Sequence, residues 1–288
     1  MTAAGVPWLP FPREAPRAIV NAPSADVRRE PAHESEMLTQ ALIGAVVSVE
    51  ETADEGKWVR ARFDDGYAGW IRSWLLVPAG EEEAGAWRTR GSFRVGALRA
   101  FVRREPESGA DIVAPVTALG RLALLGRAPG GLWCEVLFPD GRRGWISSDA
   151  ERPYFEPSGA PAEDALRAAR GLLGVPYLWG GTTPAALDCS GLTWIAWGLA
   201  GVELRRDAAM QAEDAAPVTV EEARPGDLLF FGEPEGRIGH VAIVETERRF
   251  LHAQGFVRRG SLDPSAPDFH PRLASLLRGA GRTRGPRS

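Results

Sequence analysis

Cysteine and histidine are the residue types in this chain whose spacing could support nucleophilic catalysis. Cys189 lies in the segment Asp188-Cys-Ser-Gly, directly before an apolar run. The apolar residues of that run recur at helical spacing: Leu192, Ile195, Ala196 and Leu199. They predict one buried face of a helix that begins at Cys189, with Asp188 as its N-cap. The unpaired N–H groups at such a helix start stabilise a thiolate, so we expect a lowered thiol pKa.

A thiol nucleophile also needs a base that accepts its proton and later protonates the leaving group. His240 lies at the start of the β-branched run Gly239–Glu245, and His252 lies in the second run Arg249–Ala253. Two adjacent antiparallel strands would bring these imidazoles together. One ring would then face the sulfur while the other holds its second nitrogen, as in a catalytic triad. The alternative interpretation of Cys189 is an inert buried thiol.

The first half of the chain contains an internal repeat, in which residues 56–73 match residues 131–148 without a gap. Each copy has a Trp, an Asp-Gly dipeptide and a Gly-Trp-Ile segment. Asp-Gly between β-rich runs indicates a hairpin turn, and several short strands per copy predict a small barrel. Cys134 takes the place of Val59 in this alignment, so we expect it to pack inside its barrel.

Two segments are predicted to be linkers, residues 79–91, which contain consecutive glutamates, and Arg152–Pro161, which contains three prolines. Ala162–Leu173 then predicts a helix, because Pro161 precedes it, acidic residues occupy its first turn and a glycine follows it.

Composition and motif spacing exclude several other function classes. The formal net charge of −4 gives no indication of nucleic-acid binding. No Cys/His spacing suits zinc and no Gly-rich phosphate loop is present, so we expect neither metal nor cofactor. The N-terminus lacks the basic start and apolar stretch of a secretory signal, and Ala41–Val49 is too short to span a bilayer. If Met1 is the true start, we therefore expect a cytoplasmic protein that does not bind membranes. We also expect a monomer.

The repeat resembles bacterial SH3-like domains, over roughly residues 24–78 and 92–152. The segment 160–285 resembles the NlpC family of cell-wall cysteine peptidases, because five motifs occur in that family's order. The motifs are Pro176-Tyr-x-Trp-Gly-Gly, Asp188-Cys-Ser-Gly, Arg224-Pro-Gly-Asp-Leu-Leu-Phe-Phe, Gly239-His-Val-Ala-Ile-Val and a downstream His252. The resemblance implies two small all-β SH3-like barrels followed by an α+β papain-like catalytic domain.

The same resemblance implies a role for individual residues. Cys189 matches the nucleophile, His240 the general base and His252 the residue that orients the base. Tyr177 matches a tyrosine whose hydroxyl helps to bind the oxyanion, although core packing is an equally good interpretation of that residue.

Further positions match a subsite for the N-terminal residue of the substrate: Asp188, Ser190, Trp179 and Asp207. An acid at Asp207 suits a free α-ammonium group, and the alternative for this residue is a helix N-cap. In three-domain relatives a tyrosine of the first SH3-like domain closes that subsite. Tyr67 is the candidate, because the repeat has Arg142 at the corresponding position, and Trp74 is the second candidate.

The function implied by the resemblance is hydrolysis of the γ-D-glutamyl bond to an L-diamino acid. The substrates would be murein tripeptides or tetrapeptides with a free N-terminal L-Ala, in cell-wall peptide recycling. One alternative is an amidase or acyltransferase with the same Cys/His set. Another is a non-catalytic cell-wall-binding protein that acts through its SH3-like domains.

Overall fold

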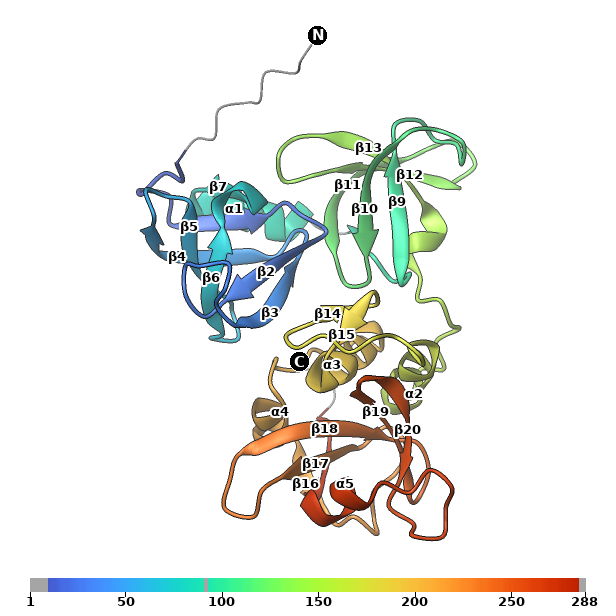
Figure 1. The fold of residues 1–288 in the computed structure, drawn as a ribbon. Coiled ribbons are helices and arrows are strands. Elements are labelled where there is room, and N and C mark those ends of the chain that lie inside the picture. Colours follow the sequence, from blue (N-terminus) through green and yellow to red (C-terminus); the bar gives the residue numbers. More distant parts are fainter. Residues whose placement is uncertain (1–9, 91–92, 285–288) are drawn as a thin grey trace. The chain divides into compact units, whose positions relative to one another are not determined.

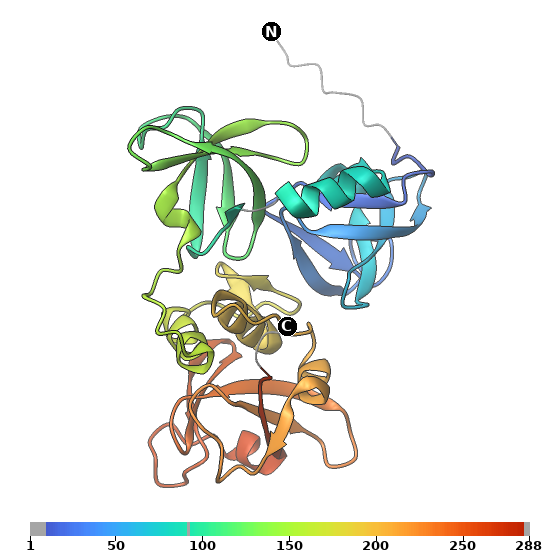
Figure 2. The same ribbon diagram turned by 180° about the vertical axis from the view of Figure 1, so that it is seen from behind.

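The computed structural model describes residues 10–90 and 93–284. The chain divides into two compact units, Met1–Val95 with Ala100–Glu151, and Gly96–Arg99 with Arg152–Ser288 (Figures 1 and 2). Residues 1–9, on which the expected cytoplasmic location depends, lie outside the described residues. No helix within the described residues is both long enough and apolar enough to cross a membrane.

The first unit begins with a seven-stranded barrel in the order β3-β2-β6-β5-β4-β1-β7. Its strands are β1 (Arg17–Val20), β2 (Ser24–Arg28), β3 (Met37–Leu42), β4 (Val46–Ala53), β5 (Trp58–Arg62), β6 (Ala68–Arg72) and β7 (Leu76–Ala79). A 3-10 turn, η1 (Ser73–Leu75), separates the last two. Alternate residues of these strands point inward, and Val27, Val59 and Ile71 are completely buried among them.

The second barrel repeats this arrangement in the order β10-β9-β13-β12-β11-β8. Its elements are β8 (Phe93–Arg94), β9 (Arg99–Arg103), β10 (Ile112–Thr117), β11 (Arg121–Arg127), β12 (Trp133–Leu137), β13 (Arg143–Ser147) and η2 (Ser148–Glu151). Strands β9, β10 and β12 each begin 75 residues after β2, β3 and β5. The repeat seen in the sequence is therefore a structural repeat.

The glycine of each Gly-Trp-Ile segment allows two strands to cross closely. A Cβ atom on Gly69 would lie 2.6 Å from Val27 Cγ1, and one on Gly144 would lie 2.5 Å from Val102 Cγ1. Cys134 is fully buried in β12, opposite Ile146, as the sequence predicts.

The predicted linker at residues 79–91 is largely helical, because Glu81–Arg90 forms helix α1 between the last strand of the first barrel and the first strand of the second (Figure 2). Residue 91 lies outside the described part. Ala84 and Trp87 are buried in a cluster with Ile19 of the first barrel and Ala123 of the second. Glutamates in the first turn and arginines in the last turn complement the helix dipole. With so few apolar residues on it, the helix had no amphipathic pattern that the sequence could reveal.

The second unit packs two longer helices and two short ones around a six-stranded antiparallel sheet in the order β16-β21-β17-β18-β19-β20. The helices are α2 (Pro161–Gly171), α3 (Cys189–Leu199), α4 (Ala208–Asp214) and α5 (Pro271–Leu276). The sheet strands are β16 (Ala216–Val218), β17 (Leu228–Gly232), β18 (Ile238–Val244), β19 (Arg249–Gln254), β20 (Phe256–Ser261) and β21 (Leu277–Arg282). A small hairpin, β14 (Thr182–Thr183) and β15 (Ala186–Leu187), precedes α3. Helices α2 and α3 lie on one side of the sheet and α5 on the other (Figure 1).

Candidate active site

Helix α3 begins at Cys189, as the sequence predicts, because Asp188 caps it. The backbone of Asp188 is extended, and its carboxylate accepts a hydrogen bond of 2.7 Å from the Gly191 N–H. The predicted apolar face is buried, and Leu192, Ile195 and Ala196 have no exposed surface. The cap and the buried face together fix Cys189 in the first turn.

The glycine of the Asp-Cys-Ser-Gly segment is required by a close backbone approach. A Cβ atom on Gly191 would lie 2.2 Å from the carbonyl oxygen of Gly181, which precedes the β14–β15 hairpin. The other carboxylate oxygen of Asp188 accepts a hydrogen bond of 2.9 Å from the Gly180 N–H. These contacts join the Trp-Gly-Gly segment to the helix start, so two motifs that are separate in the sequence form one backbone structure.

Arg206 also binds the residues at the start of α3, and the sequence interpretation missed it. Its guanidinium makes two hydrogen bonds to the carboxylate of Asp188, at 2.6 and 3.1 Å, and a third to Ser190 Oγ at 2.7 Å. All three side chains are buried. Asp188 is thus a cap and half of a buried ion pair, and its predicted place in a substrate subsite stays a prediction.

Cys189 lies against strand β18, on which α3 packs. The register pairs β18 with β19 only at Ile243 and Val244, so the preceding part of β18 is not paired with β19. The Val241 N–H there donates a hydrogen bond to the Cys189 sulfur. The sulfur therefore lies beside the backbone of the residue that follows His240.

The two strand histidines lie together, as the sequence predicts for adjacent antiparallel strands. His240 Nε2 is 3.1 Å from His252 Nδ1, and the rings meet edge to face. If Nε2–H of His240 donates to His252, then Nδ1 of His240 keeps a lone pair that can accept a thiol proton. His252 is completely buried. Its position therefore limits the rotation of the His240 ring.

The expected lowering of the thiol pKa is not what this environment produces. Burial and the nearby Asp188 carboxylate raise the pKa of Cys189 to about 12, against the opposing effects of the Val241 N–H, Arg206 and the Ser190 N–H. Burial also lowers the pKa of His240 to about 4, and that of His252 to about 3. Desolvation disfavours the thiolate of Cys189 and the imidazolium forms of the two histidines. For the Cys189 thiol, its effect on the pKa is larger than the opposite effect of the N–H groups at the helix start. Both shifts favour a neutral Cys189 thiol and a neutral His240 imidazole in the resting enzyme.

We expect spectroscopy to detect this neutral pair. The ultraviolet thiolate absorbance of the native chain minus that of Cys189→Ala should be absent at neutral pH and develop only in strongly alkaline solution. Because His240 must be neutral to accept a proton, kcat/KM should decline only as the pH falls to about 4. A complete thiolate signal at neutral pH would contradict this prediction and indicate a preformed ion pair. Cys134→Ala is the control, since burial raises the pKa of that thiol also.

The Tyr177 phenol is close enough to Cys189 for the two groups to interact electrostatically. The backbone N–H of Tyr177 donates to the Gly255 carbonyl at 2.9 Å, in the turn between β19 and β20. Burial raises the pKa of its phenol, and so do the negative charges that Cys189, when it is ionised, and Asp188 carry. The hydroxyl therefore stays protonated at neutral pH and can donate a hydrogen bond.

The remaining predicted subsite residues of this unit differ in exposure. Ser190 is buried in the Asp188–Arg206 ion pair, whereas Trp179 is 58% exposed. Asp207 is half-buried at the N-cap position of α4, but its side chain makes no capping hydrogen bond. It follows Arg206, whose guanidinium binds the Asp188 carboxylate at the start of α3.

Tyr67 and Trp74 belong to the first barrel. Tyr67 follows the Asp65-Gly66 turn, and its hydroxyl lies 3.5 Å from the Leu38 carbonyl oxygen. Trp74 is 54% exposed and stacks on the Arg72 guanidinium, whose carbon lies 4.7 Å from the ring centroid. The assignment of either residue to the substrate subsite stays a prediction.

His270 also contacts this cluster, although the sequence gave no reason to single it out. Its ring centroid lies 5.5 Å from that of His252, edge to face. Nδ1 accepts a hydrogen bond from the Leu273 N–H at the start of α5, and Nε2 bonds Gln254 Oε1 at 2.9 Å. These bonds fix a neutral tautomer, because Nδ1 must carry a lone pair and Nε2 a proton. Only the tertiary structure brings this histidine to His252.

Two segments of this chain match known protein families. Residues 174–270 match the NlpC/P60 family, and residues 27–74 match a bacterial dipeptidyl-peptidase SH3 domain. A γ-D-glutamyl-L-lysine dipeptidyl-peptidase of Bacillus subtilis is 32% identical over 75% of this chain and 71% of its own length. Dipeptidyl-peptidase 6 of Lysinibacillus sphaericus is 28% identical over 92% of this chain and 98% of its own.

A solved structure shares the fold over nearly the whole chain. The crystal structure of an NlpC/P60 family protein from Bacillus cereus superposes with a TM-score of 0.77 at 23% identity, and covers 92% of this chain and 99% of its own. The similarity to the Bacillus subtilis peptidase includes most of both chains. This chain therefore belongs to the NlpC/P60 family of cysteine peptidases.

Proposed function

We propose that this protein hydrolyses the bond between γ-D-glutamate and an L-diamino acid in murein peptides that have a free N-terminal L-Ala. Two observations support the proposal: Cys189 lies at a capped helix start and accepts a hydrogen bond from the Val241 N–H, and His240, the residue before Val241, contacts His252. The substrate class is supported by relatives named for γ-D-glutamyl-L-lysine cleavage, whose similarity extends over most of the chain.

The chemistry begins with Cys189 as a neutral thiol. As its sulfur attacks the γ-carbonyl carbon, the thiol proton passes to Nδ1 of His240, and His252 steadies the imidazolium that forms. The Tyr177 hydroxyl and backbone N–H groups at the start of α3 stabilise the oxyanion. His240 then protonates the leaving amine, the C–N bond breaks, and water hydrolyses the thioester.

The free amine of the substrate is expected to be recognised by Asp207. Acetylation removes the positive charge of that amine, which would leave a partly desolvated carboxylate without its substrate partner. Such a loss costs about 2–5 kcal/mol, or roughly thirtyfold or more in kcat/KM. The measurement is mass analysis of the products of L-Ala-γ-D-Glu-L-Lys and of its N-acetyl form.

Two variants identify the residues involved in this recognition. In Asp207→Asn the preference for the free amine should largely disappear, and in Tyr67→Phe it should weaken if Tyr67 closes the subsite. If the native enzyme cleaved the free and the N-acetylated peptide with nearly equal kcat/KM, amine recognition would be refuted. If Asp207→Asn kept the preference for the free amine, the enzyme would still recognise that amine, but through residues other than Asp207.

We further propose that the enzyme acts as a cytoplasmic monomer on released peptides, as a step of murein recycling. The proposed subsite for a free N-terminal amine supports this, because the L-Ala amine of an intact murein strand is in amide linkage. Both cysteines are free thiols, which suits a reducing compartment. Strong hydrolysis of intact sacculi, or fractionation of the native protein outside the cytoplasm, would contradict the proposal.

A further inference from the structure

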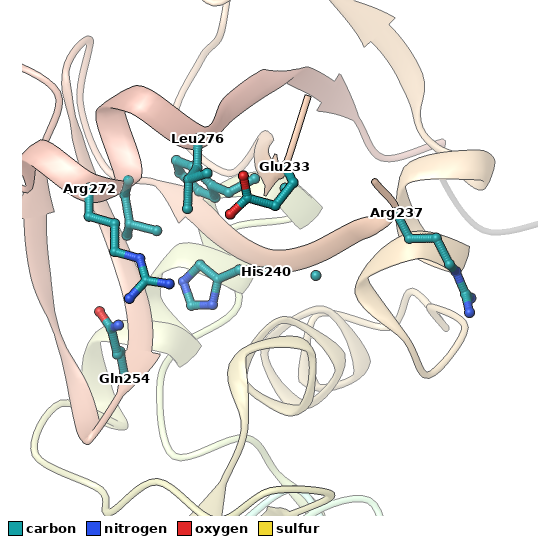
Figure 3. Close-up of a pocket in the computed structure, with 10 residues that line it drawn as sticks. Glu233, Arg237, His240, Gln254, Arg272 and Leu276 are labelled. Atoms are coloured by element: carbon teal, nitrogen blue, oxygen red, sulfur yellow. The ribbon is translucent and has the colours of Figure 1, made fainter. Parts of the chain in front are cut away.

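A pocket of about 320 Å³ lies beside His240, and no function has been assigned above to the other residues that line it (Figure 3). Its walls come from the β17–β18 hairpin, the end of β19 and helix α5. Its polar lining side chains are Glu233, Arg237, His240, Gln254 and Arg272. The volume is within the range of about 300–1,000 Å³ that is typical of small-ligand sites.

The position of the pocket relative to the chemistry suggests which part of the substrate enters it. The lining includes His240 but neither Cys189 nor any residue assigned to the N-terminal subsite. In thiol catalysis the acyl group stays on the sulfur, and the amine leaves beside the imidazole that protonates it. Because the pocket includes His240 but not Cys189, it suits the leaving group better than the acyl group.

The charges of the lining suit a carboxylate next to the leaving nitrogen. The guanidinium of Arg272 and the amide of Gln254 point toward the imidazole of His240, whereas Arg237 points away from it (Figure 3). Among the described residues, Arg272 makes no ion pair, and its side chain is exposed. Gln254 Oε1 already accepts a hydrogen bond from His270 Nε2, so the NH₂ group of the amide is the part that faces the pocket.

A guanidinium beside an amide NH₂ is a donor set for a carboxylate. The carboxyl group on the α-carbon of the leaving residue lies within two bonds of the leaving nitrogen, and hence near His240. Glu233, a carboxylate in the same lining, suits the side-chain ammonium of a diamino acid.

We propose that this pocket binds the leaving diamino acid and that Arg272, with Gln254, recognises its free α-carboxylate. The inference rests on the proposed function and specifies its substrate class. The preferred peptides are those that end at the diamino acid, since any further residue converts this carboxylate into an uncharged amide.

The test compares L-Ala-γ-D-Glu-L-Lys with the same peptide as its C-terminal amide, using the full chain. The native enzyme should cleave the free acid with a kcat/KM about tenfold or more above that for the amide. In Arg272→Gln this ratio should fall to near one, mainly through slower cleavage of the acid. Arg272→Lys should give an intermediate ratio, because it keeps the charge without the paired donors. Arg237→Gln is the matched control and should keep the native ratio.

The outcomes separate this inference from the proposed function. A native ratio near one, with both peptides cleaved after γ-D-Glu, overturns the carboxylate inference and leaves the proposed function standing. A ratio that Arg272→Gln preserves also overturns it. Failure to cleave either peptide overturns the proposed function and the inference together. Both arginines are exposed, so loss of folding does not explain a changed ratio.

Discussion

Replacing Cys189 with alanine is expected to reduce kcat/KM for L-Ala-γ-D-Glu-L-Lys by a factor on the order of 10⁴ or more. The sulfur is the only atom in the proposed mechanism that bonds to the acyl carbon, and His240 alone would have to activate water. The backbone contacts that form the helix start, the Gly191 cap and the close approach to Gly181, do not involve the side chain of Cys189. The variant should therefore remain folded.

The second cysteine is the control for this prediction. Cys134 is completely buried in β12, so Cys134→Ala should cost stability, by about 1 kcal/mol, while leaving most of the activity. Both variants should be assayed well below their unfolding temperatures, with circular dichroism as the measure of folding. If Cys134→Ala were inactive and Cys189→Ala active, the assignment of the nucleophile would be wrong.

The parts of this molecule that were predictable from sequence are those determined by local patterns. The helix start at Cys189 could be identified because a cap, a glycine and an apolar face are all within a few residues of it. The barrel repeat could be identified because turn and strand residues recur at a constant offset. The predicted fold class, all-β barrels followed by an α+β papain-like domain, is confirmed by the sheets and by the family matches.

The features that could not be predicted depend on contacts between distant segments. Helix α1 is stabilised by Trp87, which packs between two barrels and donates a hydrogen bond to the Gly44 carbonyl oxygen at 3.0 Å. The thiol pKa depends on how deeply Cys189 is buried and on the charge of Asp188, and neither follows from its position in a helix. His270 reaches His252 only because β20 and the following loop return to the end of β19.

The Asp188–Arg206 pair illustrates such a contact and is expected to have a large effect on stability. Both side chains are nearly inaccessible to solvent, and the ion pair is 2.6 Å long. In Arg206→Met the apolar stem remains, but the Asp188 carboxylate keeps only its N–H donors from Gly180 and Gly191 and the Ser190 hydroxyl. Breaking one side of a buried pair costs about 3–5 kcal/mol, because the remaining charge stays buried.

The expected result is a loss of about that size in the free energy of unfolding of the second unit, followed by denaturant titration at neutral pH. Arg205→Met is the matched control, since the adjacent Arg205 pairs with Glu213 and Asp214 at the surface and should cost less than about 1 kcal/mol. The double variant Asp188→Asn with Arg206→Met should recover part of the loss, because asparagine still caps α3 and leaves no buried charge. An Arg206→Met chain as stable as the Arg205→Met chain would mean that Asp188 does not depend on this partner. Since Arg206 also opposes the rise in the thiol pKa, its loss should slow catalysis even in the fraction of molecules that remain folded.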